Sequence, residues 1–279
     1  MEIKHIYWFA HFNLSCPSTR YRGKYALDYL NEHYNITNDF IYPSNDFKNI
    51  LSFFRVYFSV LFFRKKNSLI VFQKTRTNRF YGNSLKLLLL LRSKHTLYDI
   101  DDAEYLRRPE EPINYFIKRC SNVSVASSVL EKYCSKFNKN VFYSTSPVTD
   151  HVSKKLQRNK KPVIGWVGDY GNGNEIEKNY SHKSSLTALL FPALTHLKFD
   201  IKLVLMGIKE KEDIPELKKY FATYKHIELD IPENLNWEND SWLYEKITEF
   251  DIGVSPMLNF EFNRAKSAFK SKQYLSCGV

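Results

Sequence analysis

The sequence contains few glycines, no two cysteines close together in the chain and no hydrophobic run long enough to span a membrane. Only 9 of its 279 residues are glycine and 4 are cysteine. The cysteines follow no CxxC or other metal-binding spacing, which excludes a disulfide-stapled scaffold and favours reduced thiols. The longest apolar stretch, residues 50–63, is interrupted by Arg55 and is too short to cross a bilayer. Residues 6–10 lack the architecture of a signal peptide, so we expect a cytoplasmic protein.

Motifs of several enzyme classes are also missing. The eight histidines form no HExxH pair, there is no GxSxG nucleophile elbow, and no cysteine has the setting of a nucleophile. RNP motifs and zinc fingers are absent as well, and we therefore expect no nucleic-acid partner.

The composition is that of a globular protein with an uneven charge distribution. Hydrophobic residues make up 43% of the chain, charged residues 25% and aromatic residues 16%. The formal net charge is +11, and residues 1–161 carry 27 of the 41 basic side chains but only 13 of the 30 acidic ones. Such a basic half suggests an anionic partner such as a membrane surface or phosphate, and the alternative is a solubilising lysine-rich surface.

Short apolar runs alternate with helical patterns twice along the chain, which predicts two parallel sheets covered by helices. In the first half the expected strands are 6–10, 40–42, 69–73, 96–100, 123–126 and 141–143, and the expected helices are 22–33, 47–64, 83–92, 112–119 and 127–137. In the second half the expected strands are 163–167, 201–206, 227–229 and 252–254, and the expected helices are 183–198, 213–224, 240–249 and 264–276.

The domain organisation follows from this repetition. Residues 1–150 form one doubly wound α/β domain, the polar lysine-rich stretch 151–161 is a linker, and residues 162–279 form a second domain. We expect a cleft between the strand ends of the two domains. The second domain has only four expected strands and the chain stops where a further strand is due, which suggests a C-terminal truncation.

A glycine-rich turn follows the expected strand 163–167. Four of the nine glycines fall within residues 165–173, including Gly168, and Asp169 lies beside it. Glycines at a strand end let backbone amides approach a ligand, and the following helix N-terminus favours phosphate. The alternative is a flexible loop, because the segment matches neither a Rossmann fingerprint nor a Walker loop.

Basic residues gather near the C-terminus after the strand that ends at Pro256. Arg264, Lys266 and Lys270 are expected around the first turns of the helix 264–276. Cations at a helix N-terminus oppose the helix dipole, and a bound diphosphate would explain them. The alternative is a solvated basic face.

Two further segments of the first half carry charged groups at expected strand ends. Tyr98–Glu104 contains four acids, among them Asp101 and Asp102, which could serve metal binding, proton transfer or helix capping. Arg20 and Arg22 follow the first strand, where they could hold an anionic acceptor or lie on the surface.

An aromatic stripe along residues 53–62 has helical spacing. Core packing is its default explanation, and the neighbouring basic residues leave an interfacial membrane helix as the alternative.

Together these segments resemble the glycosyltransferase group 1 (family 4-like) enzymes of the GT-B fold, and most closely a bacterial subset that builds surface polysaccharides. The matching motifs are Ser18–Arg22, Tyr98–Ala103, Ile164–Gly168 and Phe250–Gly278, and the last is the most specific. The resemblance implies two Rossmann-like domains facing a cleft, with the second incomplete. It also implies transfer of a sugar from a UDP- or GDP-sugar donor to an acceptor hydroxyl, with retention and without a metal or other cofactor.

The resemblance also assigns roles to residues and partners. The departing diphosphate would be stabilised by Arg264, Lys266 and Lys270 and by the amides around Gly168, with Asp101 as a catalytic group towards the acceptor. The donor side would comprise Gly168, Asp169, Lys183, Pro256, Arg264, Lys266, Lys270 and Gln273, and the acceptor side Arg20, Arg22, Asp101 and Asp102. The acceptor would be a saccharide or lipid-linked saccharide, and the protein would lie peripherally at the inner face of an anionic membrane.

Three positions depart from the family pattern. Gln273 stands where the family usually has a ribose-binding glutamate, Ala265 replaces a second glutamate, and Asp101 stands in place of a histidine. Together with the expected truncation, these departures leave an alternative function, that of an inactive GT-B remnant that acts as a binding or scaffold subunit.

Overall fold

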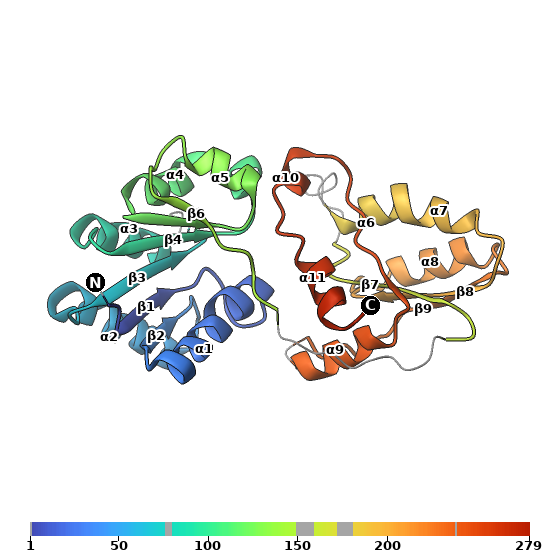
Figure 1. Ribbon diagram of the computed structural model, residues 1–279, viewed down its shortest axis with the longest axis horizontal. Helices are drawn as coiled ribbons and strands as arrows, with labels where there is room; N and C mark the ends of the chain where they lie inside the picture. The colour runs from blue at the N-terminus through green and yellow to red at the C-terminus, as the bar shows by residue number, and fades with distance from the viewer. Residues whose placement is uncertain (1, 76–79, 149–158, 172–180, 238) are drawn as a thin grey trace. The chain divides into compact units, whose positions relative to one another are not determined.

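A computed structural model describes residues 2–75, 80–148, 159–171, 181–237 and 239–279. By their contacts the residues divide into two compact units. The first comprises Met1–Pro147 and Ala265–Ser267, and the second comprises Val148–Arg264 and Ala268–Val279. Each is an α/β unit with its own sheet (Figure 1). The linker predicted at 151–161 lies mostly outside the described residues.

The described part of the first unit contains a six-stranded parallel sheet in the order β2-β1-β3-β4-β5-β6. All five residues of β1 are buried, as expected for a strand covered on both faces. The strands are β1 (His5–Phe9), β2 (Thr37–Ile41), β3 (Ser68–Gln73), β4 (Thr96–Ile100), β5 (Asn122–Val125) and β6 (Val141–Tyr143). The α-helices are α1 (Tyr25–Tyr34), α2 (Phe47–Phe63), α3 (Phe80–Leu91), α4 (Glu110–Arg119) and α5 (Ser128–Cys134). A π-helical segment, η1 (Thr19–Lys24), leads into α1, and a 3-10 turn, η2 (Glu104–Leu106), follows β4.

Parallel pairing brings the carboxyl ends of three strands of this sheet together. Phe9 of β1 pairs with Phe72 of β3, and Gln73 pairs with Asp99 of β4. Residues that follow β1, β3 and β4 therefore meet at one edge, which is where open α/β sheets bind ligands.

The second unit contains, among its described residues, a four-stranded parallel sheet in the order β10-β7-β8-β9. Its strands are β7 (Val163–Val167), β8 (Ile201–Met206), β9 (Ile227–Asp230) and β10 (Ile252–Gly253). Its helices are α6 (His182–Ser185), α7 (Phe191–Thr195), α8 (Asp213–Phe221), α9 (Asp240–Thr248), α10 (Glu261–Arg264) and α11 (Phe269–Ser276), with a π-helical segment, η3 (Leu186–Leu190), between α6 and α7.

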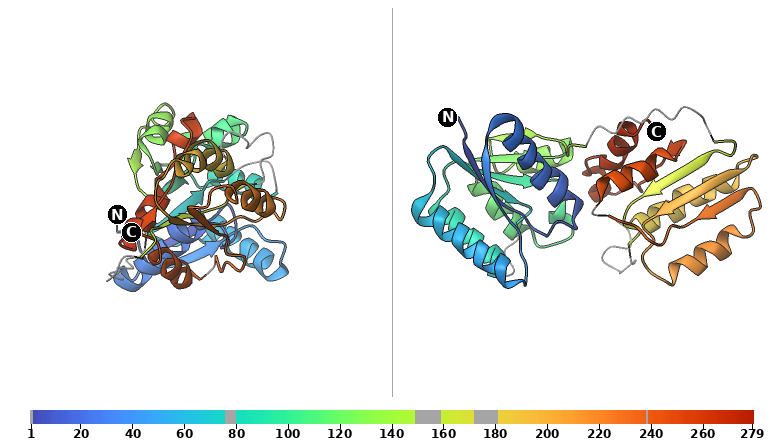
Figure 2. Two further views of the ribbon diagram at one scale, coloured as in Figure 1. Left: turned by 90° about the vertical axis from the view of Figure 1, so that its right-hand side faces the viewer. Right: turned by 90° about the horizontal axis from the view of Figure 1, so that it is seen from below.

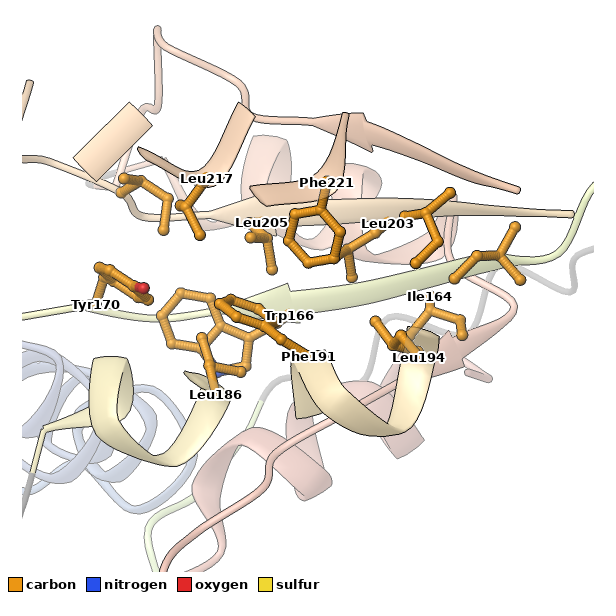
Figure 3. Packing of buried hydrophobic residues seen from close by; sticks show 13 residues of the cluster. Ile164, Trp166, Tyr170, Leu186, Phe191, Leu194, Leu203, Leu205, Leu217 and Phe221 are labelled. Atoms are coloured by element: carbon orange, nitrogen blue, oxygen red, sulfur yellow. The ribbon is translucent and has the colours of Figure 1, made fainter. Parts of the chain in front are cut away.

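Alternation along β7 distributes its side chains between two helical layers. Ile164 and Trp166 pack with Phe191 of α7 and Phe221 of α8 in one apolar cluster, which Figure 3 shows from close by. Residues between them point the other way, where a Cβ on Gly165 would lie 2.1 Å from the Phe250 ring. Glycine is needed there because the ring occupies the space of a side chain.

The structure confirms the α/β class and the alternation of strands and helices, and it corrects one expected helix. The single helix predicted at 264–276 is wrong, because α10 ends at Arg264 and α11 begins only at Phe269. Ala268, which precedes α11, has a left-handed backbone with φ of 52°, which a continuous right-handed helix cannot contain. The four cysteines, all in described segments, are free thiols, and Cys120, Cys134 and Cys277 are buried.

Candidate functional site

A buried lysine joins the ends of β3 and β4 in the first unit. Lys74 directly follows β3, and its side chain is only 5% exposed. Its Nζ lies 2.9 Å from Asp101 Oδ1 and 2.7 Å from Asp102 Oδ2, and both aspartates follow β4. Ser18, which precedes η1, donates its hydroxyl proton to the other carboxylate oxygen of Asp101. The predicted acidic segment is therefore the anionic half of an ion-pair network.

Charge pairing decides the protonation states in this network. Burial alone would raise the pKa of Asp101, but Lys74 and Arg22 hold it well below its usual range. Burial alone would lower the pKa of Lys74, but Asp101 and Asp102 raise it well above its usual value. A catalytic base works best with a pKa near the working pH. Asp101 is therefore suited to anchoring Lys74 and Ser18 rather than to accepting a proton.

Arg22 forms a second buried pair behind this network. Its Nε donates to Asp99 Oδ2 at 2.9 Å, and its Nη2 donates to the other oxygen of the same carboxylate. Nη1 donates to the carbonyl of Ser144 at 2.6 Å. Arg20 donates through Nη1 to the carbonyls of Leu14 and Ser15. Both arginines are buried within their own unit, which argues against the predicted direct contact with an acceptor.

Lys266 is grouped by its contacts with the first unit, whereas Arg264 and Lys270 belong to the second. Burial lowers the pKa of Lys266, and Asp102 opposes that shift. The three cations expected on the first turns of one helix therefore do not share a helix, because α10 ends at Arg264 and α11 begins at Phe269. Lys266 adds its charge to the Lys74 network instead.

Backbone hydrogen bonds hold the glycine-rich turn of the second unit against the end of β8. The amide of Gly168 donates to the carbonyl of Met206 at 2.9 Å, and the amide of Tyr170 donates to the carbonyl of Gly207 at 3.2 Å. Gly207 has φ of 119°, and a Cβ there would lie 1.6 Å from the Gly168 carbonyl oxygen. These two amides join the ends of β7 and β8. The role predicted for the amides around Gly168 in stabilising a diphosphate stays a prediction.

A lysine side chain occupies the space above Gly168. A Cβ at this position would lie 2.6 Å from Cε of Lys270, which is on the first turn of α11. Tyr274, one turn later on the same face of α11, donates its hydroxyl proton to the carbonyl of Val254 at 3.1 Å and accepts from the amide of Val167. The tyrosine thereby anchors α11 against β7 and β10 and holds Lys270 at the end of β7.

His182 lies beside this lysine, and we call the two residues the Lys270–His182 pair. Lys270 Nζ lies 3.0 Å from His182 Nε2, within hydrogen-bond distance. Ser181 accepts a hydrogen bond from the amide of Ser184 as the N-cap of α6, and this cap sets where His182 begins the helix. The rings of Trp166 and His182 make a T-shaped contact, with their centroids 5.6 Å apart.

The other residues predicted on the donor side have varied surroundings. Lys183 forms an ion pair with the buried carboxylate of Asp213, and Asp169 pairs with Lys209 at 2.9 Å on the surface. Gln273 is buried, Pro256 is half-buried and Arg264 is exposed. The structure therefore brings Gly168 and Lys270 together, and it brings Asp101 and Asp102 together.

Sequence reasoning missed Lys74 and His182. Each lies at the end of a predicted element, Lys74 after a buried strand and His182 after a capping serine, and that placement is the signal that could have identified them. Across the part of the chain that the structure describes, no three His, Cys, Asp or Glu side chains gather as metal ligands. The same part contains no helix long and apolar enough to span a bilayer.

Comparison with known proteins gives a likeness of fold. No family model matches the chain. No curated protein matches it either. The structure of S. aureus MnaA with UDP is 12% identical, matches over 90% of this chain and 73% of its own, and has a TM-score of 0.53.

Two further solved structures are less similar. The Glycosylation Associate Protein (Gap123) complex of Streptococcus agalactiae is 11% identical over 84% of this chain, with a TM-score of 0.47, and this chain spans only 45% of its length. Starch Synthase IV of Arabidopsis thaliana is 9% identical over 95% of this chain and 81% of its own, with a TM-score of 0.48. The two parallel sheets and the likeness to MnaA together show that the chain has the GT-B fold.

Proposed function

We propose that this chain is a glycosyltransferase that moves a sugar from a nucleotide-sugar donor to an acceptor hydroxyl. The observation that carries the proposal is the Lys270–His182 pair at the carboxyl end of β7, with Nζ and Nε2 3.0 Å apart. Strand ends are where open α/β sheets bind nucleotides. The fold likeness supports this, because the similar structure of S. aureus MnaA was solved with UDP.

The proposed chemistry follows from the charge of the leaving group. A nucleoside diphosphate departs with growing negative charge, and a cation held in place before the reaction stabilises that charge. Lys270 supplies the cation, and Gly168 allows it to lie directly over the strand end. His182 lies within hydrogen-bond distance of Lys270 and so orients its side chain. Retention at the anomeric carbon and independence from a metal are parts of the proposal that rest on the family resemblance.

The acceptor is proposed to be a saccharide or a lipid-linked saccharide that binds the first unit. The proposed setting is polysaccharide synthesis at the inner face of an anionic membrane. The excess of basic residues in residues 1–161 supports this setting, since it favours an anionic surface.

Calorimetric titration of the full chain with UDP, GDP and ADP tests the proposal. We expect one diphosphate to bind, and we expect Lys270→Ala to weaken that binding by about 1.5–3 kcal/mol, roughly ten- to a hundred-fold, the range for hydrogen bonds to charged groups. The matched control is Lys246→Ala, which removes a partly exposed lysine of α9 whose partner is Glu249. That variant should bind like the wild type, because surface ion pairs contribute little.

Equal affinity of the wild type and Lys270→Ala would remove Lys270 from the site. Absence of binding by all three nucleotides would contradict the donor site itself. Nucleotide binding without any transfer or donor hydrolysis would instead favour the second candidate, an inactive binding or scaffold subunit. The observation that favours this candidate is Gln273, a buried amide where the resembled family has a carboxylate.

A further inference from the structure

The longest helix described in the first unit, α2, carries apolar side chains on part of its exposed side as well as on its buried side, and Lys48 and Arg55 are exposed beside them. Phe53, Val56, Tyr57 and Val60 of α2 pack inward. Along the opposite side lie Leu51, Phe58 and Phe62, which are 53%, 48% and 63% exposed. The large apolar side chains of a surface helix normally face the core. In the right-hand view of Figure 2, however, α2 runs along the outside of its unit.

The neighbouring helix continues this exposed surface. Phe80 at the start of α3 lies 6.0 Å from the ring of Phe54 and is 67% exposed. Leu90 and Leu91 at the end of α3 are more than half exposed. Arg92 donates to the carbonyl of Leu61, which joins the C-terminal ends of the two helices. We call the exposed apolar side chains of both helices the α2–α3 face.

The rings along this face are ordered rather than scattered. Phe54, Phe58 and Phe62 follow one another at i, i+4 spacing, with centroid distances of 6.1 and 6.2 Å and nearly parallel planes. Phe63, at the end of the row, is 81% exposed. Single exposed apolar side chains are ordinary, but a contiguous row of them marks an interaction surface.

The charge around the face identifies its partner. Residues 47–98 contain eleven Lys and Arg and not one Asp or Glu. One of the eleven, Lys74, is buried and paired with Asp101 and Asp102, so it adds no charge to the face. Lys65 and Lys66 follow Phe63 by two and three residues, and Lys94 follows Leu91 by three residues. All three lysines are exposed. Aromatic side chains beside lysines are the combination that binds the interface of anionic bilayers.

We propose that the α2–α3 face docks on the surface of an anionic phospholipid bilayer, with its phenylalanines in the interface and its lysines on the headgroups. A second copy of the chain fits less well, because a two-fold interface pairs a patch with itself and would bring the two positive segments together. This inference rests on the proposed membrane location and gives it a surface. It requires neither nucleotide binding nor transfer.

Sedimentation with lipid vesicles tests this docking in the absence of nucleotide. One set of vesicles is phosphatidylcholine alone, and the other is an equimolar mixture with phosphatidylglycerol. The full chain should sediment with the anionic vesicles only. Lys65→Glu combined with Lys66→Glu should lower the partition coefficient by more than roughly 30-fold, since each lysine near an anionic surface contributes about fivefold. Phe62→Ser combined with Phe63→Ser should lower it by at least about tenfold.

Matched controls come from exposed residues of the second unit. Phe199 is 54% exposed, and Lys218 and Lys219 are adjacent exposed lysines of α8. Phe199→Ser should leave partitioning within about twofold of the wild type. Lys218→Glu combined with Lys219→Glu should do the same, because none of these residues belongs to the α2–α3 face. Lys270→Ala should also partition like the wild type, which separates this test from that of the donor site.

Three results would overturn the proposal. One is equal sedimentation of the wild type with neutral and anionic vesicles, and another is unchanged partitioning of both α2–α3 variants. The third is a dimer in sedimentation velocity that dissociates on Phe62→Ser with Phe63→Ser, which would assign the face to a second copy of the chain.

Discussion

Gly168 shows that a glycine at a strand end can make room for a side chain instead of a ligand. Its amide donates to the end of β8, and the place of its missing Cβ is taken by Lys270. A glycine-rich turn after a buried strand is usually interpreted as a set of free amides. Here the turn instead lets α11 bring a cation to the end of β7, so the charge comes from a side chain more than 100 residues away in the chain.

Protonation of Asp101 should lower the stability of the first unit at acid pH. Its folded pKa is depressed, so its contribution is complete above the ordinary pKa of 3.8 and is lost as the pH falls through the folded pKa. Between pH 5 and pH 3 we expect the wild type to lose about 1 kcal/mol more unfolding free energy than Asp101→Asn, because the amide does not titrate. Urea unfolding at both pH values, followed by circular dichroism, measures this difference.

At neutral pH the same substitution should cost about 3 kcal/mol, the low end for breaking a buried ion pair, since Lys74 retains Asp102. Asp28→Asn serves as the control, because Asp28 pairs with Lys24 on the surface of α1 and should cost less than about 1 kcal/mol. If Asp101→Asn and the wild type lose equal stability between pH 5 and pH 3, Asp101 is not the group whose protonation destabilises the first unit at acid pH.

At the scale of elements, the break between α10 and α11 decides which unit each cation joins. Ala265–Ser267 are grouped with the first unit, and Ser127 of that unit donates its hydroxyl proton to the carbonyl of Ala265 at 2.6 Å. Ala268 then starts α11 from a left-handed conformation, with φ of 52° and ψ of 31°. Such a backbone costs an alanine roughly 1–2 kcal/mol, which the surrounding contacts must offset.

Ala268→Gly should therefore raise the free energy of unfolding by about 0.5 kcal/mol. Glycine removes the strain of the left-handed backbone, and the greater freedom of the unfolded chain offsets part of the gain. Ala222→Gly is the matched control, because Ala222 has φ of −58° at the end of α8 and is exposed. There glycine should lower stability by about 0.5–1 kcal/mol. Chemical denaturation of both variants measures the two signs, and a loss of stability in Ala268→Gly would contradict the strain argument.

Most elements could be predicted because their signals are local. Buried strands such as β1 and β7 are unbroken apolar runs, and Asp46 caps α2 at the residue before the expected helix. The break at Ala268 could not be predicted, since alanine favours helix and only tertiary contacts hold it left-handed. Lys74 and His182 were missed for a similar reason. Their partners come from other strands and helices, and no local pattern encodes such pairings.

At the scale of the whole molecule, the chain consists of two units with separate sheets and separate cores. The apolar cluster of Trp166 and Phe221 lies wholly in the second unit, and the cluster of Trp8 and Leu27 lies in the first. Units with their own cores can unfold in separate cooperative steps. The proposed functions are divided in the same way, because the Lys270–His182 pair is in the second unit and the α2–α3 face is in the first.

Scanning calorimetry should therefore resolve two transitions, and a nucleoside diphosphate should stabilise only that of the second unit. At a nucleotide concentration 100 times the dissociation constant, ligand binding adds about 2.7 kcal/mol to the unfolding free energy of the unit that binds it. Asp101→Asn should lower the other transition and thereby assign it to the first unit. In Lys270→Ala the stabilisation by nucleotide should fall to about 0.4–1.4 kcal/mol at the same concentration, because its binding is ten- to a hundred-fold weaker. If the nucleotide moves the transition that Asp101→Asn lowers, the donor site is in the first unit and the proposed division of roles is reversed.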